Sequence, residues 1–279
     1  MERESSTEEG ENDLEYIKGE VEFRNISFSY PGSSSQVIHN MNITIEGGSK
    51  VAFVGPSGVG KSTAFKLLMG MLEPTEGTIL IDGQDIKTLK TDSLHEVIGM
   101  MPQNSYLFNT TVMENITFAR QNATYEECYD ACCRAGIEKT IKGRAGQYGA
   151  TTGENGANFS GGERQRLVLA RIFIQKPKIV LIDEGTSALD AETEALIKHS
   201  IDQEFAGRTV IIVAHRLSSI RRVDKIFVLG TCGKIVEEGN HDELVAKGCE
   251  YAKYWKMHLG EELPVDEPSV GEPLIDVSS

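Results

Sequence analysis

The sequence has no uninterrupted apolar run that approaches the roughly 20 residues needed by a membrane-spanning helix. Its longest apolar runs, at 179–182 and 210–214, have the length of buried strands. The first 20 residues are acidic and lack the apolar stretch of a secretory signal peptide. Hydrophobic residues nevertheless make up 39% of the 279 residues, which is enough for a real core. We therefore expect a soluble chain built around a globular domain.

Positive charge is scarce at both ends of the chain. Residues 1–22 contain nine acids and two bases, and residues 261–279 contain six acids and no base. Because the whole chain has a formal net charge of −14, the body between these tails is close to neutral. Acidic tails are usually solvated, and a nucleic-acid-binding protein favours a basic surface. The composition therefore predicts solvated tails and no nucleic-acid partner.

Cysteines are few and poorly placed for pairing. There are five, an odd number, and no Cys-x-x-Cys pair occurs. Cys132 and Cys133 are adjacent, which is a poor geometry for a disulfide or for two ligands of one metal ion. Because disulfides persist mainly outside the cytosol, we expect all five to be reduced thiols.

Strand-like and helix-like patterns alternate along much of the chain. Strands are expected at 21–28, 37–45, 51–54, 78–81, 179–183, 210–214 and 226–229, because apolar residues there alternate or form short runs bounded by turn residues. Helices are expected at 61–71, 124–136, 161–174, 241–247 and 249–259. This alternation favours an α/β fold with a mostly parallel sheet.

Segment 104–176 has a different character, because strand patterns become rare and helical patterns take over. We interpret it as an α-helical subdomain inserted into an α/β core. The catalytic core then comprises residues 19–103 and 177–260. Residues 1–18 are expected to be an acidic linker, and residues 261–279 a disordered acidic tail.

The segment Gly55–Ser62 fits the phosphate-loop pattern G-x-x-x-x-G-K-[ST] and lies between a predicted strand and a predicted helix. Glycines let backbone N–H groups turn towards phosphates, and the helix N-terminus adds partial positive charge. The Lys61 ammonium is expected to reach the β- and γ-phosphates, and the Ser62 hydroxyl to bind Mg²⁺. The predicted nucleotide contacts of this segment are Gly55, Ser57, Gly58, Val59, Gly60, Lys61, Ser62 and Thr63.

Two carboxylates, Asp183 and Glu184, directly follow the apolar run 179–182. Sheets of this type bind ligands at the carboxyl ends of their strands. We therefore assign Mg²⁺ binding, direct or through water, to Asp183. We assign polarisation of an attacking water to Glu184. Without the phosphate loop, an acid pair after a strand would be interpreted as an exposed turn.

With these motifs in place, residues 19–260 resemble the nucleotide-binding domain of an ATP-binding cassette (ABC) transporter. The other motifs that carry the resemblance are Tyr30 in Phe-Ser-Tyr-Pro, Gln103 in Met-Pro-Gln, the signature segment Phe159–Glu163, the loop Ser187–Asp190 and His215 in Val-Ala-His-Arg. The resemblance implies a RecA-like P-loop NTPase core with an antiparallel β part and an inserted helical subdomain. It also implies ATP and Mg²⁺ as cofactors.

The resemblance assigns roles to several side chains around the nucleotide. Tyr30 stacks on the adenine with Val37 beside it, and Gln103 contacts Mg²⁺ and senses the transmembrane part. His215 contacts the γ-phosphate. The catalytic set implied in this way is Glu184, His215, Lys61 and Gln103, and the metal set is Ser62, Gln103 and Asp183.

The signature segment implies a second chain. In the family that this sequence resembles, the segment opens a helix whose N-terminus faces the γ-phosphate held by the other subunit. Asp190 belongs to the loop that crosses to that subunit. Two chains then clamp two ATP molecules head to tail, through the isologous contact that a two-fold interface requires. The signature contacts implied here are Ser160, Gly161, Gly162 and Glu163.

Three further segments resemble exporters in particular. Gly153–Gly156 is similar to an exporter loop that touches the membrane domains, and Leu107, Phe108 and Glu114–Ile116 are similar to the exporter coupling region. The pattern that starts at Ile17 resembles the junction after the last membrane helix. The expected partners are therefore a second nucleotide-binding domain and transmembrane domains, fused or separate. The expected location is the cytosolic face of a membrane, or the matrix face if mitochondrial.

The signature segment departs from the family pattern at two positions. Phe159 stands where Leu is usual, and Glu163 where Gln is usual. A carboxylate at residue 163 is expected either to weaken binding of the partner's nucleotide or to face solvent. Glu at this position also occurs in mitochondrial half-transporters linked to iron–sulfur and thiol-compound export. Gly185 replaces the usual Ala after Glu184, which is expected to loosen that carboxylate.

Two other functions compete with the exporter motor. A soluble ABC ATPase of DNA repair would have long coiled coils between phosphate loop and signature, and one of translation would have tandem cassettes. This chain has one copy of each motif, and Ser160 lies 100 residues after Gly60. A regulatory module without turnover is opposed by the presence of Lys61, Asp183 and His215 together with Glu184.

Overall fold

The computed structural model describes residues 10–15, 17–33, 35–183, 191–214 and 220–259. The strands of these ranges are β1 (Val21–Phe28), β2 (Ile38–Ile45), β3 (Lys50–Val54), β4 (Glu76–Ile81), β5 (Gln84–Asp85), β6 (Ile98–Met101), β7 (Ile179–Asp183), β8 (Thr209–Val213), β9 (Lys225–Leu229) and β10 (Ile235–Gly239). They form a larger sheet in the order β10-β9-β3-β8-β7-β6 and a smaller one in the order β2-β1-β4-β5.

The larger sheet is mostly parallel, which confirms the predicted α/β class. Strand β3 pairs in parallel with β8 and β9, and β7 pairs in parallel with β6 and β8. Strand β10 closes one edge in antiparallel pairing with β9. The smaller sheet is antiparallel, with β1 between β2 and β4. It is the antiparallel β part that the resemblance implied.

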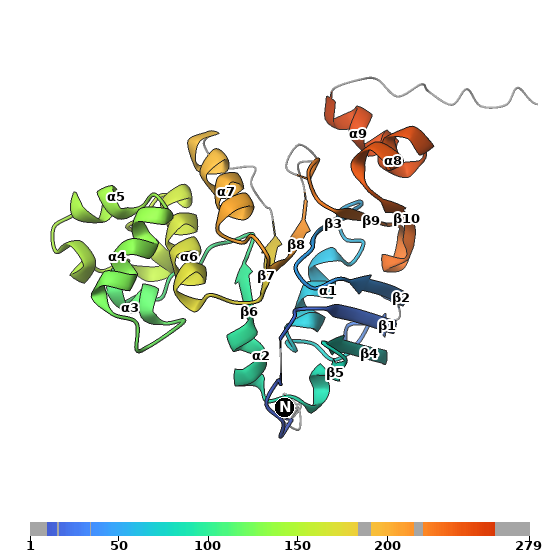
Figure 1. The fold of residues 1–279 in the computed structure, drawn as a ribbon, viewed down its shortest axis with the longest axis horizontal. Coiled ribbons are helices and arrows are strands. Elements are labelled where there is room, and N and C mark those ends of the chain that lie inside the picture. The colour runs from blue at the N-terminus through green and yellow to red at the C-terminus, as the bar shows by residue number, and fades with distance from the viewer. Residues whose placement is uncertain (1–9, 16, 34, 184–190, 215–219, 260–279) are drawn as a thin grey trace, which may run out of the picture.

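The helices lie on both sides of the larger sheet (Figure 1). They are α1 (Lys61–Leu68), α2 (Thr91–Val97), α3 (Val112–Thr117), α4 (Tyr125–Arg134), α5 (Glu138–Lys142), α6 (Gly161–Gln175), α7 (Ala191–Gln203), α8 (His241–Lys247) and α9 (Glu250–Leu259). Helix α1 ends three residues before its predicted end, because Gly70 adopts φ of +69° and its N–H turns back to Leu67 O. Within the described ranges, no helix is both long and apolar enough to cross a membrane.

Helices α1 and α6 pack on opposite faces of the larger sheet. Val51 and Phe53 of β3 belong to the same buried cluster as the apolar residues of α1 and of the small sheet. Ala52 and Val54 point the other way, into the cluster that contains α6. Helix α1 therefore lies between the two sheets, and α6 joins the larger sheet to the helices α3, α4 and α5 (Figure 1).

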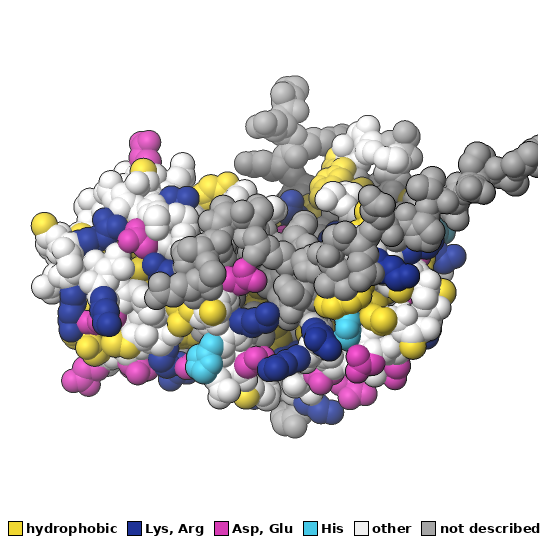
Figure 2. Space-filling view, turned by 90° about the horizontal axis from the view of Figure 1, so that it is seen from above, with side chains coloured by type: hydrophobic (Ala, Val, Ile, Leu, Met, Phe, Trp, Pro, Cys, Tyr) yellow, Lys and Arg dark blue, Asp and Glu magenta, His cyan; other side chains and the backbone are white. Residues whose placement is uncertain are grey.

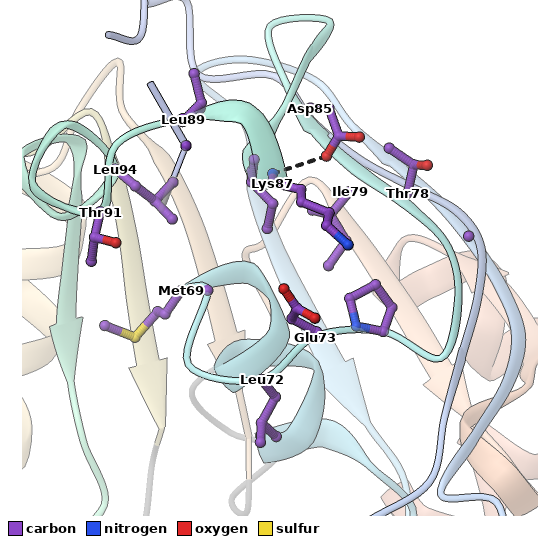
Figure 3. A pocket seen from close by; sticks show the side chains of 15 residues that line it. Met69, Leu72, Glu73, Thr78, Ile79, Asp85, Lys87, Leu89, Thr91 and Leu94 are labelled. Atoms are coloured by element: carbon purple, nitrogen blue, oxygen red, sulfur yellow. Dashed lines mark hydrogen bonds between the residues drawn. The ribbon is translucent and has the colours of Figure 1, made fainter. Parts of the chain in front are cut away.

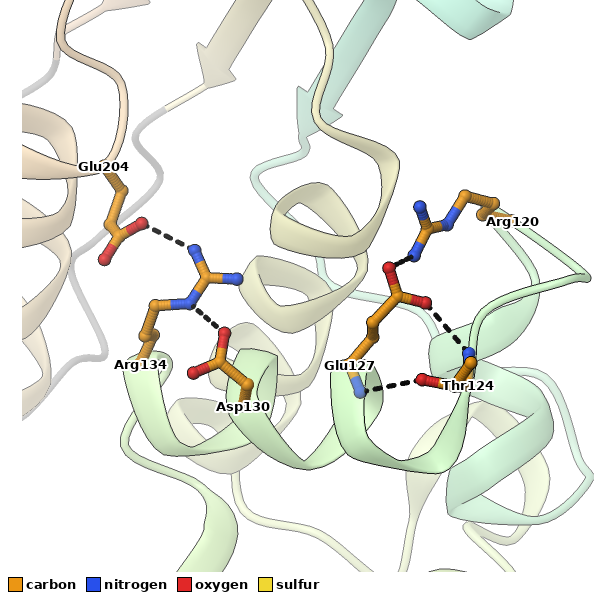
Figure 4. A network of polar contacts seen from close by, with 6 residues as sticks. All are labelled: Arg120, Thr124, Glu127, Asp130, Arg134 and Glu204. Atoms are coloured by element: carbon orange, nitrogen blue, oxygen red, sulfur yellow. Dashed lines mark hydrogen bonds and ion pairs between the residues drawn. The ribbon is translucent and has the colours of Figure 1, made fainter.

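The helices α3–α6 form a separate part beside the strand β6. A salt bridge joins this part to the core, since Arg134 Nη1 of α4 lies 2.6 Å from Glu204 Oε2 beyond α7 (Figure 4). The same guanidinium binds Asp130 on its own helix. On the face shown in Figure 2, basic and acidic side chains are interspersed over these helices. The five cysteines are free thiols, as the sequence predicted, and Cys128 and Cys132 of α4 are buried.

The chain enters the domain through a fixed point at residues 18–20. The Asp82 carboxylate accepts hydrogen bonds from the three backbone N–H groups of this segment, at 2.7–3.1 Å. The Thr209 hydroxyl donates to Gly19 O at 2.6 Å and accepts from the Gly48 N–H at 2.9 Å. Because Asp82 follows β4 and Thr209 begins β8, residue 19 is tied to both sheets at once.

Part of the segment that was expected to be a linker also packs on the core. The Asn12 N–H donates to Thr88 O, and Asn12 O accepts from the Lys90 N–H. Two residues later, the Leu14 N–H donates to the Ser93 hydroxyl at 2.8 Å. The chain between residues 12 and 14 is thus held against the start of α2.

A buried histidine links the two last helices and gives a pH prediction. His241 Nδ1 lies 2.8 Å from the Tyr251 hydroxyl, and its ring packs edge-on against Trp255. Burial lowers the pKa of His241, helped by the positive charge of Arg221 and opposed by Asp242. The folded state therefore prefers the neutral imidazole. The stabilisation is complete above the ordinary pKa of about 6.5, and it is lost as the pH falls below that value.

We expect the thermal midpoint to fall between pH 7.5 and pH 5.5, and to fall less in His241→Gln, because that variant has no buried imidazole to protonate. Thermal unfolding followed by circular dichroism measures both slopes. His39→Gln, at an exposed position of β2, is the matched control and keeps the wild-type slope. Equal slopes in the His241 variant and the wild type would contradict the prediction.

Candidate nucleotide-binding site

The loop between β3 and α1 has the backbone of a phosphate cradle. Gly55 has φ of +152°, and a Cβ there would lie 2.3 Å from Leu229 O, so only glycine fits. The Lys61 side chain, 4% exposed, folds back over the loop. Its Nζ donates to Gly55 O at 2.8 Å and to Pro56 O at 2.7 Å. The ammonium thus lies inside the loop, where a phosphate group would meet it.

The Lys61 ammonium is also electrostatically poised for an anion. Burial lowers its pKa, because desolvation penalises the charged form, and the Asp183 carboxylate partly opposes this by raising it. A triphosphate in the loop would replace the lost solvation with opposite charge. The structure therefore supports the assignment of Lys61 to the phosphates.

The predicted metal ligands Ser62 and Asp183 meet in the structure although 121 positions separate them. Ser62 Oγ donates to Asp183 Oδ2 at 2.9 Å, across the gap between α1 and the end of β7. Asp183 is 7% exposed, and its second oxygen, Oδ1, is buried without a hydrogen-bond partner. Hydroxyl and carboxylate oxygens are ligands that Mg²⁺ accepts. An orphaned carboxylate oxygen beside the phosphate loop is thus what a magnesium site requires.

The predicted adenine contacts lie beside the same loop. The Tyr30 hydroxyl is 3.2 Å from Thr63 Oγ1, and the Tyr30 ring packs edge-on against Phe28 and is 37% exposed. The backbone of Val37 approaches Gly60, since a Cβ at that glycine would lie 3.1 Å from Val37 O. An accessible aromatic ring therefore stands next to the start of α1. The bond from Tyr30 to Thr63 could not be inferred from the sequence.

The structure describes only one of four further predicted site residues, Gln103. Gln103 is exposed and comes two residues after β6. Because Met101, the last residue of β6, pairs with Ile182 of β7, Gln103 follows β6 at the same edge of the sheet where Asp183 ends β7. The other three predicted residues, Glu184, Asp190 and His215, fall outside the described residues, as do Gly185 and the rest of the loop Ser187–Asp190.

The signature residues open α6 through a capping box. Ser160 Oγ accepts the Glu163 N–H, and Glu163 Oε2 accepts the Ser160 N–H at 2.7 Å. Arg164 Nη1 donates to Phe159 O at 2.8 Å and so holds the residue before Ser160 against the first turn of the helix. Gly161 is exposed and Gly162 is buried.

The conformation of Glu163 corrects the expectation that its carboxylate would face solvent. The side chain is 19% exposed, and besides capping the helix it accepts a hydrogen bond from Arg144 Nη2 at 3.1 Å. The Arg144 guanidinium in turn lies over the Phe159 ring, 3.9 Å from its centroid. The sequence gives no local signal for this contact, because Arg144 precedes Glu163 by 19 positions.

A pocket of about 320 Å³ lies at the other end of α1, away from this chemistry (Figure 3). Its walls include Met69, Leu72, Ile79 and Leu94, with the Asp85 carboxylate accepting the Lys87 N–H at one side. None of the residues predicted to bind nucleotide lines it. We therefore place the candidate site at the phosphate loop and not in this pocket.

A phosphate loop between β3 and α1, with a buried carboxylate at the end of β7, defines the class of P-loop ATPase domains. Comparison with known proteins narrows this class, because a family model described as "ABC transporter" matches residues 38–187. The chain belongs to the ABC transporter family.

Similar proteins point to one branch of that family. ABC transporter B family member 13 of Arabidopsis thaliana is 43% identical over 86% of this chain and 19% of its own length. ATP-binding cassette sub-family B member 6 of Xenopus tropicalis is 43% identical over 92% of this chain and 30% of its own. The mitochondrial potassium channel ATP-binding subunit of Rattus norvegicus is 40% identical over 91% and 36%. The chain thus spans about a fifth to a third of these curated relatives.

A solved structure supports the same placement. A bacterial Atm1-family ABC exporter with ATP bound superposes with a TM-score of 0.85 at 38% identity. The match covers 91% of this chain and 44% of that exporter. The fold is therefore that of the nucleotide-binding ATPase domain of an ABC exporter, and the resemblance seen in the sequence is confirmed.

Proposed function

We propose that this chain is the motor of a membrane exporter, in which two such domains bind two molecules of Mg·ATP head to tail and hydrolyse them. One observation carries the proposal. Helix α1 with the phosphate loop and helix α6 with the signature segment lie on opposite faces of the larger sheet. A nucleotide bound at the start of α1 therefore does not occupy the start of α6 in the same chain. The start of α6 remains available for a second nucleotide, held by the other subunit.

The residues at the site divide the chemistry between them. Lys61 and the loop amides hold the β- and γ-phosphates, and Tyr30 stacks on the adenine. Ser62 and Asp183, with Gln103 nearby, would hold Mg²⁺, which supplies charge neutralisation at the phosphates when bound.

Three further roles complete the site of a closed dimer. We assign Glu184 to orienting and polarising the attacking water, and His215 to the γ-phosphate. Asp190 stands in the loop that crosses to the other subunit. The partner's signature residues, equivalent to Ser160, Gly161 and Gly162, complete the site. Residues 19–260 make up the cassette in this proposal, with residues 104–176 as its helical subdomain.

An exposed aromatic platform, formed by Tyr106, Phe108 and Phe118, suits contact with the membrane domains. The side chains are 47–64% exposed, and the rings of the two phenylalanines lie 4.4 Å apart. Arg171 holds the backbone that carries the platform, because it donates to the backbone oxygens of Tyr106 and Asn115. Burial lowers the pKa of Arg171 to about 10, so the guanidinium remains charged at neutral pH.

Two segments that resemble exporters, Leu107–Phe108 and Gly153–Gly156, meet at this platform. A hollow is lined by Phe108 and its neighbours and also by Glu154 and Asn155. Exposed aromatic residues around a hollow are typical of a protein interface. We therefore propose the platform as the contact with transmembrane domains, on the cytosolic face of a membrane or on the matrix face of a mitochondrial one. The alternative function, a soluble ABC ATPase, has no membrane domains that this platform would contact.

The dimer proposal is tested with Glu184→Gln. This change removes the base but keeps the side-chain length, so Mg·ATP binds and is not hydrolysed. We expect the variant to form a stable dimer with Mg·ATP, and the wild type to hydrolyse ATP with a rate that rises more than linearly with protein concentration. Size-exclusion chromatography with light scattering measures the first, and phosphate release the second.

The control is the double variant Glu184→Gln/Lys61→Met, which we expect to stay monomeric because it lacks the phosphate contact. A Glu184→Gln protein that stays monomeric at saturating Mg·ATP and turns over normally would contradict both the base assignment and the dimer. Wild-type turnover strictly proportional to protein concentration would indicate a monomeric ATPase.

A further inference from the structure

The two unusual residues of the signature segment belong to one cluster of three side chains, which we call the signature cluster: Arg144, Phe159 and Glu163. Arg144 comes from the loop after α5 and reaches both other members, with its guanidinium over the Phe159 ring at 3.9 Å and its Nη2 at 3.1 Å from Glu163 Oε2. Phe159 is 3% exposed, so the aromatic face is a buried support for the guanidinium. Cation–π and charge-assisted contacts of this kind fix a side chain in one orientation.

The signature cluster determines which groups remain free at the start of α6. Glu163 Oε2 is occupied by the Ser160 N–H and by Arg144, and Ser160 Oγ accepts the Glu163 N–H. The Ser160 hydroxyl hydrogen is left to donate elsewhere. The N–H groups of Gly161 and Gly162 have no intrahelical partner, as in the first turn of any α-helix. The Ser160 hydroxyl and the first N–H groups of α6 are therefore donors available to a phosphate, and the charge that faces them is that of the Glu163 carboxylate.

The negative charge of Glu163 is the obstacle to that use. A carboxylate in the first turn stabilises the helix itself through the helix dipole, but it repels an anion that approaches the same end. Solvent and salt reach the pair only in part, since the Glu163 side chain is 19% exposed and that of Arg144 30%, so much of the repulsion would persist at physiological ionic strength. Arg144 supplies the opposite charge in direct contact, so the pair presents no net charge to a triphosphate.

We propose that Arg144 is a positioning residue for the ATP held by the partner subunit: it holds the Glu163 carboxylate against the Ser160 N–H and neutralises it, so that the start of α6 can receive the γ-phosphate. This inference rests on the head-to-tail dimer proposed above. It explains how the chain carries Glu163 in its signature segment without losing the nucleotide contact there.

A double-variant cycle tests the role of Arg144. In Arg144→Met the Glu163 charge is unopposed, and we expect the KM for ATP in the steady-state ATPase assay to rise about tenfold, which corresponds to about 1.4 kcal/mol. In Arg144→Met/Glu163→Gln the amide oxygen still accepts the Ser160 N–H but carries no charge. The KM of this double variant is expected to return to within about twofold of Glu163→Gln alone.

Two further readouts separate this role from simple packing. The raised KM of Arg144→Met should fall with increasing ionic strength, because salt screens the repulsion. Binding of a fluorescent ATP analogue to dilute, monomeric protein should be unchanged, because it reports on the phosphate loop alone. Arg144→Gln, which keeps a hydrogen-bond donor without the charge, serves as a second variant and should show the same rise in KM.

Helix α4 offers a matched control within the same group of helices. It begins with a capping box made by Thr124 and Glu127, and Arg120 forms an ion pair with that glutamate (Figure 4). Arg120→Met therefore removes an arginine from an equivalent helix start that is not part of the signature. We expect its KM for ATP to match that of the wild type.

Three outcomes would overturn the proposal. The first is an unchanged KM in both Arg144 variants. The second is a rise in KM that Glu163→Gln does not reverse, which would show that Arg144 only packs against Phe159. The third is an equal rise in Arg120→Met. Failure of the dimer proposal can be distinguished, because it is measured on the wild type without any variant, as turnover proportional to protein concentration. That result would also exclude the positioning role of Arg144.

Discussion

Lys61→Met is expected to weaken ATP binding about 100-fold or more. The ammonium now bonds to two carbonyls of its own loop, at 2.7 and 2.8 Å, and would exchange these bonds for phosphate oxygens. Each hydrogen bond with a charged partner contributes roughly 1.5–3 kcal/mol, and 1.4 kcal/mol corresponds to a tenfold change in affinity. Methionine fills the same buried space without charge. Equilibrium binding of a fluorescent ATP analogue measures the effect.

Lys66→Met is the matched control, because Lys66 lies on the same helix with its side chain exposed. We expect its ATP affinity to equal that of the wild type. Nucleotide-free Lys61→Met should unfold at a temperature no lower than the wild type, since the substitution removes a buried charge. Wild-type affinity in Lys61→Met would refute the phosphate assignment of this residue.

Asp183→Asn should lower the ATPase rate at least about 100-fold and make nucleotide binding insensitive to Mg²⁺. The carboxylate is buried, and only one of its oxygens is occupied, by the Ser62 hydroxyl. An asparagine oxygen can still accept that bond but lacks the charge that holds the metal ion. The magnitude follows from the several kcal/mol of charge stabilisation that a metal ion supplies in a transition state. Phosphate release and nucleotide titrations with and without Mg²⁺ measure these effects.

Compared with the wild type, the ATP affinity of Asp183→Asn should be higher without Mg²⁺ and lower with Mg²⁺. Without Mg²⁺, ATP affinity is expected to rise, because a negative charge next to the phosphates has been removed. With Mg²⁺, the gain in affinity that the wild type shows is expected to vanish. Asp202→Asn, at a surface position paired with Lys50, provides the control with unchanged behaviour. A normal dependence on Mg²⁺ in Asp183→Asn would remove Asp183 from the metal site.

The sequence predicted those parts of the site that depend on local patterns. The phosphate loop is defined by eight consecutive residues, and the strand and helix around it have strong apolar periodicity. Asp183 was placed because a buried strand must end at the ligand-binding edge of the sheet. The meeting of Ser62 with Asp183 then follows from the fold class, and the structure confirms it.

Elements without a strong period were missed. Strand β6 has four residues and directly follows α2, so the two patterns merge in the sequence. Strand β10 contains Glu237 and Glu238 and lies at the sheet edge, where polar residues are tolerated and the apolar signal is weak.

The signature cluster could not be predicted from the sequence for a different reason. The bond between Arg144 and Glu163 depends on how the loop after α5 folds back onto α6, which no residue pattern encodes. The sequence did identify Phe159 and Glu163 as unusual. It could not show that one arginine connects them.

The anchor at residue 19 has a mechanical consequence. A force applied to the chain at Lys18 would be divided between the bonds of Asp82 and those of Thr209, and it would reach both sheets within one residue. Strand β8 pairs directly with β3, which leads into the phosphate loop, and with β7, which ends at Asp183. Residue 19 is therefore connected to the nucleotide site through hydrogen-bonded strands. Traction at this end of the domain would therefore displace the nucleotide site as a rigid body, and would not stretch a compliant tether.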